Sequence, residues 1–254
     1  MNQKHENYKL LNLLGYGLAK FDNDFIKEFG CKTKTEFFNF FVDNGIVKTA
    51  SVVKNRMDLF DYFFPQNPRK GWWQKGDAYI HRKHLIDSLF GDENVAGFAN
   101  IIKLILKKGY RIELAHKVSP LLESKFKKMQ STGLEAELYF LHNFNEIEIL
   151  QNGKITDARL YGDGYDFFVE TTKSEFLCEI KGVRESSGGI RLTQNEFEKA
   201  KEFSDCYLLV AVMNLQNSPQ FKSILNPLES LEFTEKILHQ KAIKEYHLVG
   251  SLAV

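Results

Sequence analysis

Two carboxylates and one ammonium group are predicted to meet in the second half of the chain. Residues 166–183 are rich in β-branched and aromatic types and turn at Lys173-Ser174, which is typical of a β-hairpin. A hairpin with this turn places Asp166 opposite Lys181 and diagonal to Glu179. Cross-strand partners share a face of the sheet, so the three groups would lie together, with the Cα atoms of diagonal neighbours about 7–8 Å apart.

This set of groups is suited to metal-assisted hydrolysis of a phosphodiester. Two carboxylates at this reach can hold Mg²⁺, which binds one or two carboxylates and completes its shell with waters and phosphate oxygens. The lysine beside them could position a water, or help to deprotonate it, for attack on phosphorus. The opposing interpretation is a solvated strand pair, since lysine and glutamate alternate on many exposed strands.

The elements around the hairpin predict an α/β domain. Thr193 and Glu196 form a capping box, which marks the start of a helix and by itself explains Glu196. The order helix, strand, strand, strand, helix, strand predicts a mixed sheet flanked by helices. The long helix is predicted over 122–144 with a break near Gly133, and further strands are predicted over 146–150 and 207–213.

Four short motifs in this half resemble the PD-(D/E)XK nuclease superfamily. They are Gly133-Leu134-Glu135-Ala136-Glu137, Gly164-Tyr165-Asp166, Glu179-Ile180-Lys181-Gly182 and Leu192-Thr193-Gln194-Asn195-Glu196. The likeness is to restriction-endonuclease-like domains that carry an E-x-K-G step followed by L-T-x-N-E, and it covers about residues 125–230. Tyr165 replaces the proline of the family name, which is a tolerated change because the chemistry lies in the acidic residue.

The resemblance implies a role for each residue of the central motif. Asp166 and Glu179 would hold Mg²⁺ together with the backbone carbonyl of Ile180. Lys181 would orient the attacking water. The chain would then be a Mg²⁺-dependent deoxyribonuclease.

Four neighbouring residues are further candidates for this site. The resemblance implies that Glu137 joins the metal site. An ordinary carboxylate on a helix surface is an equally good interpretation of this residue. Gln194 resembles a glutamine that supports the active site in members of that superfamily. An ordinary solvated glutamine is an equally good interpretation. Arg184 and Arg191 flank a Ser-Gly loop at 186–189 and could contact phosphates, or the loop is only a connection.

The first half of the chain is basic, whereas the second half is acidic. Residues 1–118 carry 19 Lys and Arg against 13 Asp and Glu, a net charge of +6, and residues 119–254 carry 15 against 20, a net charge of −5. We therefore predict a mainly helical DNA-recognition domain at 1–118 and the nuclease domain at 119–254. Two ordinary solvated surfaces could produce the same asymmetry.

The densest basic and aromatic stretch of the first half is the predicted DNA contact. Cations can neutralise phosphates and aromatic rings can stack on bases. A charged loop around one buried tryptophan is the alternative interpretation. The predicted contact residues are Arg69, Lys70, Trp72, Trp73, Lys75, Arg82 and Lys83.

Two other patterns in the first half are weaker. Residues 21–30 and 35–44, joined by a short polar turn, have the proportions of a helix-turn-helix, although any helical bundle offers such pairs. His81 and His84 have the spacing of metal ligands, but without a third ligand of suitable spacing we expect them at the surface.

Composition narrows the class of protein. The three cysteines lie far apart, which argues against a disulfide framework and a zinc ribbon, and the longest apolar run is too short to span a bilayer. We therefore expect a cytoplasmic protein without a membrane partner.

The function that fits best is a stand-alone restriction enzyme, a homodimer that cuts double-stranded DNA beside a companion DNA methyltransferase. The alternative is a non-cleaving DNA-binding or complex-forming subunit that keeps the nuclease fold.

Overall fold

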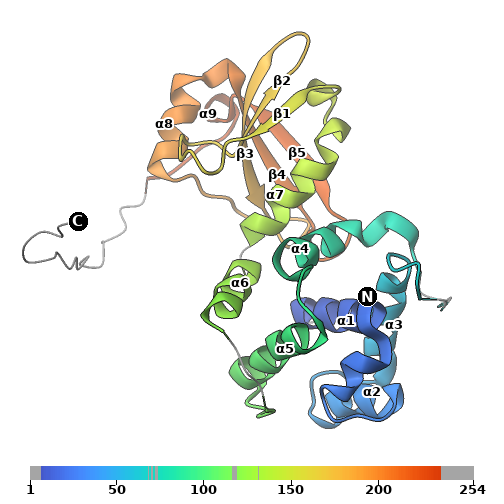
Figure 1. Ribbon diagram of the computed structural model, residues 1–254. Coiled ribbons are helices and arrows are strands. Elements are labelled where there is room, and N and C mark those ends of the chain that lie inside the picture. The colour runs from blue at the N-terminus through green and yellow to red at the C-terminus, as the bar shows by residue number, and fades with distance from the viewer. Residues whose placement is uncertain are drawn as a thin grey trace, which may run out of the picture.

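The computed structural model describes residues 7–67, 69, 71, 74–115, 119–130 and 132–235. A helical N-terminal region precedes a five-stranded mixed sheet flanked by helices, which confirms the predicted α/β fold class (Figure 1). Among the described residues, no helix is long and apolar enough to cross a membrane.

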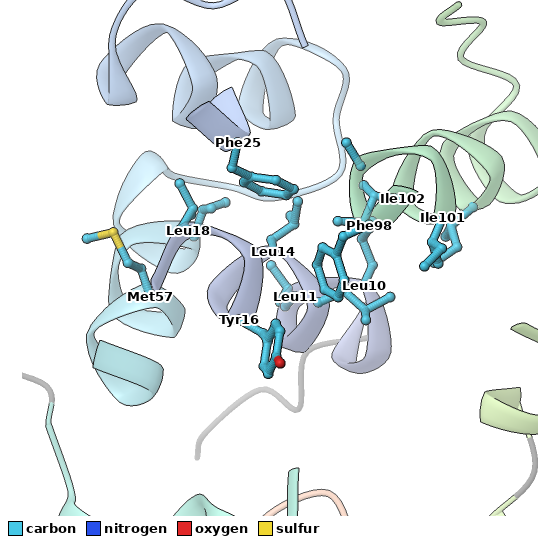
Figure 2. Close-up of a cluster of buried hydrophobic side chains, with 14 of the residues drawn as sticks. Leu10, Leu11, Leu14, Tyr16, Leu18, Phe25, Met57, Phe98, Ile101 and Ile102 are labelled. Carbon is cyan, nitrogen blue, oxygen red and sulfur yellow. The ribbon is translucent and has the colours of Figure 1, made fainter. Parts of the chain in front are cut away.

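The N-terminal region is built around one long helix, because α1 is apolar on nearly every side. Leu11, Leu14 and Leu18 are fully buried, and Phe98 of α5 packs with them in the core that Figure 2 shows. The helices of this region are α1 (Tyr8–Lys27), α2 (Lys34–Asp43), α3 (Ala50–Asp61), α4 (Ile80–Phe90), α5 (Val95–Tyr110) and α6 (Pro120–Gln130), with a 3-10 turn η1 (Gly76–Tyr79).

The predicted helix-turn-helix corresponds to the end of α1 and to α2. The predicted first helix is the last part of the longer α1, which bends at Asp22, where φ is +50°. A capping box of Thr33 and Glu36 starts α2. Phe37 and Phe41 of α2 are fully buried, so this helix packs into the core of the region.

The sheet has the strand order β1-β2-β3-β4-β5, and β3 and β4 form its parallel pair. Apolar residues of α7 pack on one face, while residues of α8 and α9 pack on the other (Figure 1). The elements of this region are α7 (Thr132–Asn143), β1 (Lys154–Asp157), β2 (Phe167–Glu170), β3 (Glu175–Gly182), α8 (Gln194–Glu202), β4 (Tyr207–Met213), β5 (Gln220–Leu225) and α9 (Pro227–Ser230), with 3-10 turns η2 (Phe144–Glu146), η3 (Glu148–Leu150) and η4 (Ser204–Cys206).

The strand predicted over 146–150 is wrong, because this segment lies in the 3-10 turns η2 and η3. Extended Ile147 separates the two turns, and Phe144, Ile147 and Leu150 are buried, so each turn places its apolar residues in the core. The long predicted helix is described as two helices: α6 ends at Gln130 and α7 begins at Thr132, close to the expected break near Gly133.

The hairpin of β2 and β3 forms, but with a register different from the predicted one. Glu170 pairs with Glu175, and the Thr171 hydroxyl closes a four-residue loop by accepting a bond from the Ser174 N–H (3.0 Å). Continued along the strands, this register places Asp166 opposite Glu179 rather than Lys181. The shift is two residues, and side chains alternate with a period of two, so every predicted facing is retained.

Candidate active site

An acidic hollow of about 570 Å³ opens where β3, the start of α7 and the loop before α8 meet. Asp166, Glu179 and Lys181 all line it, and they come from the end of the β1–β2 connection and from β3. The charged side chains that line this acidic hollow are Glu137, Asp166, Glu179, Lys181, Arg191 and Glu196.

Backbone contacts fix Asp166 at the wall of the acidic hollow. Its N–H donates to the Cys178 carbonyl (3.0 Å), and its carboxylate accepts a bond from the Ile180 N–H (2.8 Å). The preceding turn needs a glycine, because Gly164 has φ +85° and a Cβ there would lie 2.8 Å from the Asn195 carbonyl oxygen. The Tyr207 hydroxyl donates to the Gly164 carbonyl (3.0 Å), which ties this turn to the sheet.

Lys181 is held between two carboxylates. Its Nζ donates to Glu179 Oε1 and to Glu196 Oε2, each at 2.6 Å. Glu196 also accepts a bond from the Thr193 N–H (3.0 Å), so one carboxylate both caps α8 and binds the lysine. Sequence reasoning explained Glu196 by the cap alone and missed its place in the acidic hollow; the L-T-x-N-E motif that contains it was the available signal.

Burial, followed by nearby carboxylates, perturbs the two predicted metal ligands. Burial raises the pKa of Asp166 to about 6, although the bond from Ile180 opposes the shift. Burial, followed by the nearby charge of Asp166, raises the pKa of Glu179 to about 8. Burial lowers the pKa of Lys181, but the carboxylates of Glu179 and Glu196 outweigh it, and the net shift is upward. Neither carboxyl group therefore has enough positive charge nearby to offset the cost of its burial.

These donors fit a hard divalent cation. Among the described residues, no group of three or more His, Cys, Asp or Glu side chains is arranged to hold a metal ion, so a cation here would have only two carboxylate ligands from the protein. Asp166 and Glu179 supply two carboxylates, and Mg²⁺ takes its remaining ligands from carbonyls, waters and phosphate oxygens. A cation would also supply the positive charge that the two buried carboxylates lack.

The end of β3 approaches α7 closely at Gly182. A Cβ at this position would lie 2.5 Å from the Thr132 carbonyl oxygen and 3.0 Å from Ala136 Cβ. The absence of a side chain therefore lets the start of α7 form a wall of the acidic hollow. On this wall, Glu137 accepts a bond from Arg159 (2.9 Å).

Three other predicted residues of this half lie in different places. Arg191 lines the acidic hollow, whereas Arg184 is exposed and does not line it. Gln194 is exposed and donates to Glu198 Oε1 (2.7 Å), so its amide is engaged along α8 instead of facing the lysine.

Among the residues of the predicted DNA stretch that the structure describes, two of the cations, Arg69 and Lys83, are paired with carboxylates. Arg69 binds both oxygens of the buried Asp61 and also pairs with Asp22 at the bend of α1. Lys83 pairs with Asp87, and exposed Lys75 lies over the Tyr79 ring at 5.8 Å. Lys70, Trp72 and Trp73 lie outside the described residues.

Arg82 joins the two regions instead of pointing outward. Only 3% of this residue is exposed, and its guanidinium donates to the carbonyls of Gln216 (2.8 Å) and Asn217 (3.3 Å) in the β4–β5 turn. The surface position expected for His81 is wrong, because this residue is buried against Tyr139 of α7. Packing of α4 against α7 accounts for the burial of His81, whereas the contact of α4 with the β4–β5 turn accounts for that of Arg82.

The comparisons with known proteins find one similarity, and it falls on the region that carries the acidic hollow. Residues 136–224 match the model of the family described as Protein NO VEIN, C-terminal. That domain is related to the restriction-endonuclease-like nuclease fold. No curated protein and no solved structure matches the chain significantly. The matched segment runs from α7 to β5 and includes Asp166, Glu179 and Lys181.

Proposed function

We propose that this chain is a Mg²⁺-dependent endonuclease that hydrolyses phosphodiesters of double-stranded DNA. The observation that carries the proposal is the convergence of Asp166, Glu179 and Lys181 in one open acidic hollow. The match to a domain related to a nuclease fold supports the same reaction class.

We assign each residue of this set a role that its contacts support. The carboxylates of Asp166 and Glu179, with the Ile180 carbonyl, would hold Mg²⁺, which when bound supplies charge neutralisation at the phosphate. Lys181 would orient the attacking water through its ammonium group, which Glu179 and Glu196 hold in place. Arg191 on the wall would contact the phosphate.

The setting we propose is a restriction enzyme acting beside a companion DNA methyltransferase. One acidic hollow of this kind cuts one strand at a time, and the strands of a duplex are antiparallel. Two hollows related by a two-fold axis would cut both strands together, so we propose a homodimer as the active form.

Plasmid cleavage tests the reaction directly. We expect the purified protein to convert supercoiled plasmid to nicked or linear DNA with Mg²⁺ and not with EDTA. Asp166→Asn, Glu179→Gln and Lys181→Met should each lower the rate by at least about a hundredfold. Glu175→Gln is the matched control, because Glu175 lies exposed at the other end of β3 and should leave the rate within about twofold.

Two results would contradict the proposal. Full activity of Lys181→Met would remove the catalytic assignment. An intact plasmid under all conditions, with DNA binding retained in a gel shift, would instead favour the non-cleaving subunit.

A further inference from the structure

Two large apolar side chains project into solvent from the segment that joins β1 to β2. Leu160 is 97% exposed and Tyr161 is 67% exposed, which are the highest values among the large apolar side chains that the structure describes. Scattered exposed apolar residues are ordinary, but an adjacent pair at one tip is a small apolar surface. We call Leu160 and Tyr161 the apolar tip.

The segment that carries the apolar tip is tied down on both sides. The Tyr161 N–H donates to the Ala158 carbonyl (2.9 Å), and the Ala158 N–H donates to the Asp166 carbonyl (2.9 Å). Beyond the tip, the Asn195 amide of α8 donates to the Gly162 carbonyl (2.7 Å). In Figure 1 this yellow segment accordingly lies beside α8. The exposure of the tip is therefore built into an anchored turn.

The segment that carries the apolar tip is linked to the acidic hollow on both sides of the tip. On one side, neighbouring Arg159 donates to Glu137, which lines the hollow (2.9 Å). On the other side, the segment ends at Asp166, the proposed metal ligand. A duplex with a phosphate in the hollow would thus have the tip beside it.

We infer that the apolar tip contacts the bases of the DNA duplex next to the phosphate held in the acidic hollow. The inference rests on the proposed function, since it takes the hollow as the phosphate site. Asp163 beside the tip is exposed, and Arg159 on the other side already pairs with Asp157 and Glu137, which disfavours a contact between this turn and phosphates. Apolar and aromatic side chains instead stack on bases or insert at base steps. The cation for the phosphate is Arg191, inside the hollow.

Salt dependence separates contacts to bases from contacts to phosphates. Loss of a phosphate contact reduces the dependence of affinity on salt concentration, whereas loss of an apolar base contact lowers affinity equally at every salt concentration. The test measures anisotropy of a fluorescent mixed-sequence duplex with Ca²⁺ in place of Mg²⁺, over a series of salt concentrations, with plasmid cleavage under Mg²⁺ measured in parallel.

For the variant Leu160→Ser with Tyr161→Ser, we expect affinity to fall about tenfold with an unchanged salt slope. The control is Leu121→Ser with Tyr62→Ser, which removes a leucine and a tyrosine that are also exposed but do not line the hollow, and should change affinity less than about twofold. Arg191→Gln should instead lower the salt slope. Thermal melts check folding, and the single variants Leu160→Ala and Tyr161→Ala repeat the test with smaller changes.

Each other outcome has a defined meaning. Wild-type affinity in the double variant, or a lowered salt slope, would overturn the inference and leave the nuclease proposal intact. Tip-dependent DNA binding without any cleavage would support the inference and overturn the nuclease proposal. A wild-type protein that neither binds nor cuts DNA would overturn both. A dimer that becomes monomeric in the double variant without DNA, measured by light scattering, would overturn the inference, because the tip would then contact a second copy of the chain.

Discussion

One partly buried hydrogen bond ties the N-terminal region to the start of α7, and its removal should destabilise the whole protein. The Tyr8 hydroxyl donates to the Glu135 carboxylate (2.8 Å) and also lies 3.0 Å from the Leu215 carbonyl oxygen. Glu135 is only 3% exposed, and burial raises its pKa although the bond from Tyr8 opposes that shift. Tyr8→Phe keeps the ring and deletes the donor.

The expected cost follows from the charge and burial of the acceptor. A hydrogen bond to a charged group contributes about 1.5–3 kcal/mol, and a buried acceptor left without its donor retains its desolvation penalty. We therefore expect Tyr8→Phe to lower the free energy of unfolding by about 2–3 kcal/mol. For a chain of this size the melting temperature should fall by roughly 4–12 °C.

Urea unfolding followed by fluorescence measures this loss, and a double-mutant cycle assigns it to the pair. Glu135→Leu with Tyr8→Phe removes both partners, so its cost should be about 1.5–3 kcal/mol less than the sum of the single variants. Tyr62→Phe is the control, because Tyr62 is 48% exposed, and it should cost less than about 0.5 kcal/mol. Additive single costs, or a Tyr8→Phe protein as stable as wild type, would refute the reasoning.

Two further predictions concern packing and pH. Gly182→Ala should cost about 1–3 kcal/mol in a urea melt, because the new Cβ meets Thr132 and Ala136; Gly189→Ala, with open space around it, should cost less than about 0.5 kcal/mol, and equal costs would contradict the packing argument. Burial lowers the pKa of His81 to about 3, so the unfolded chain binds the extra proton as the pH falls below about 6.5, and stability falls with it. Between pH 7 and pH 5 the wild type should lose about 2 kcal/mol more than His81→Leu, and parallel pH profiles would refute this.

Several features of the candidate site were predictable from the sequence because they depend on local patterns. The β-branched runs predicted the hairpin and β4, and the capping box predicted the start of α8. The shared face of Asp166, Glu179 and Lys181 depends only on the two-residue period of a strand. It was therefore retained when the register differed by two residues.

Other features were decided by contacts between residues far apart in the chain. The sequence around Arg82 predicts a surface cation. Its hydrogen-bond partners are instead backbone carbonyls of the β4–β5 turn, more than 130 residues away. The local sequence predicts only a helix cap for Glu196, whereas the fold also places Lys181 of β3 within hydrogen-bond distance of it. The segment 146–150 alternates acidic and apolar residues as a strand does, yet it forms 3-10 turns that bury Ile147 and Leu150. Sequence periodicity thus determined which face each side chain occupies, whereas tertiary packing decided which charges are neutralised inside the protein and which remain for the acidic hollow.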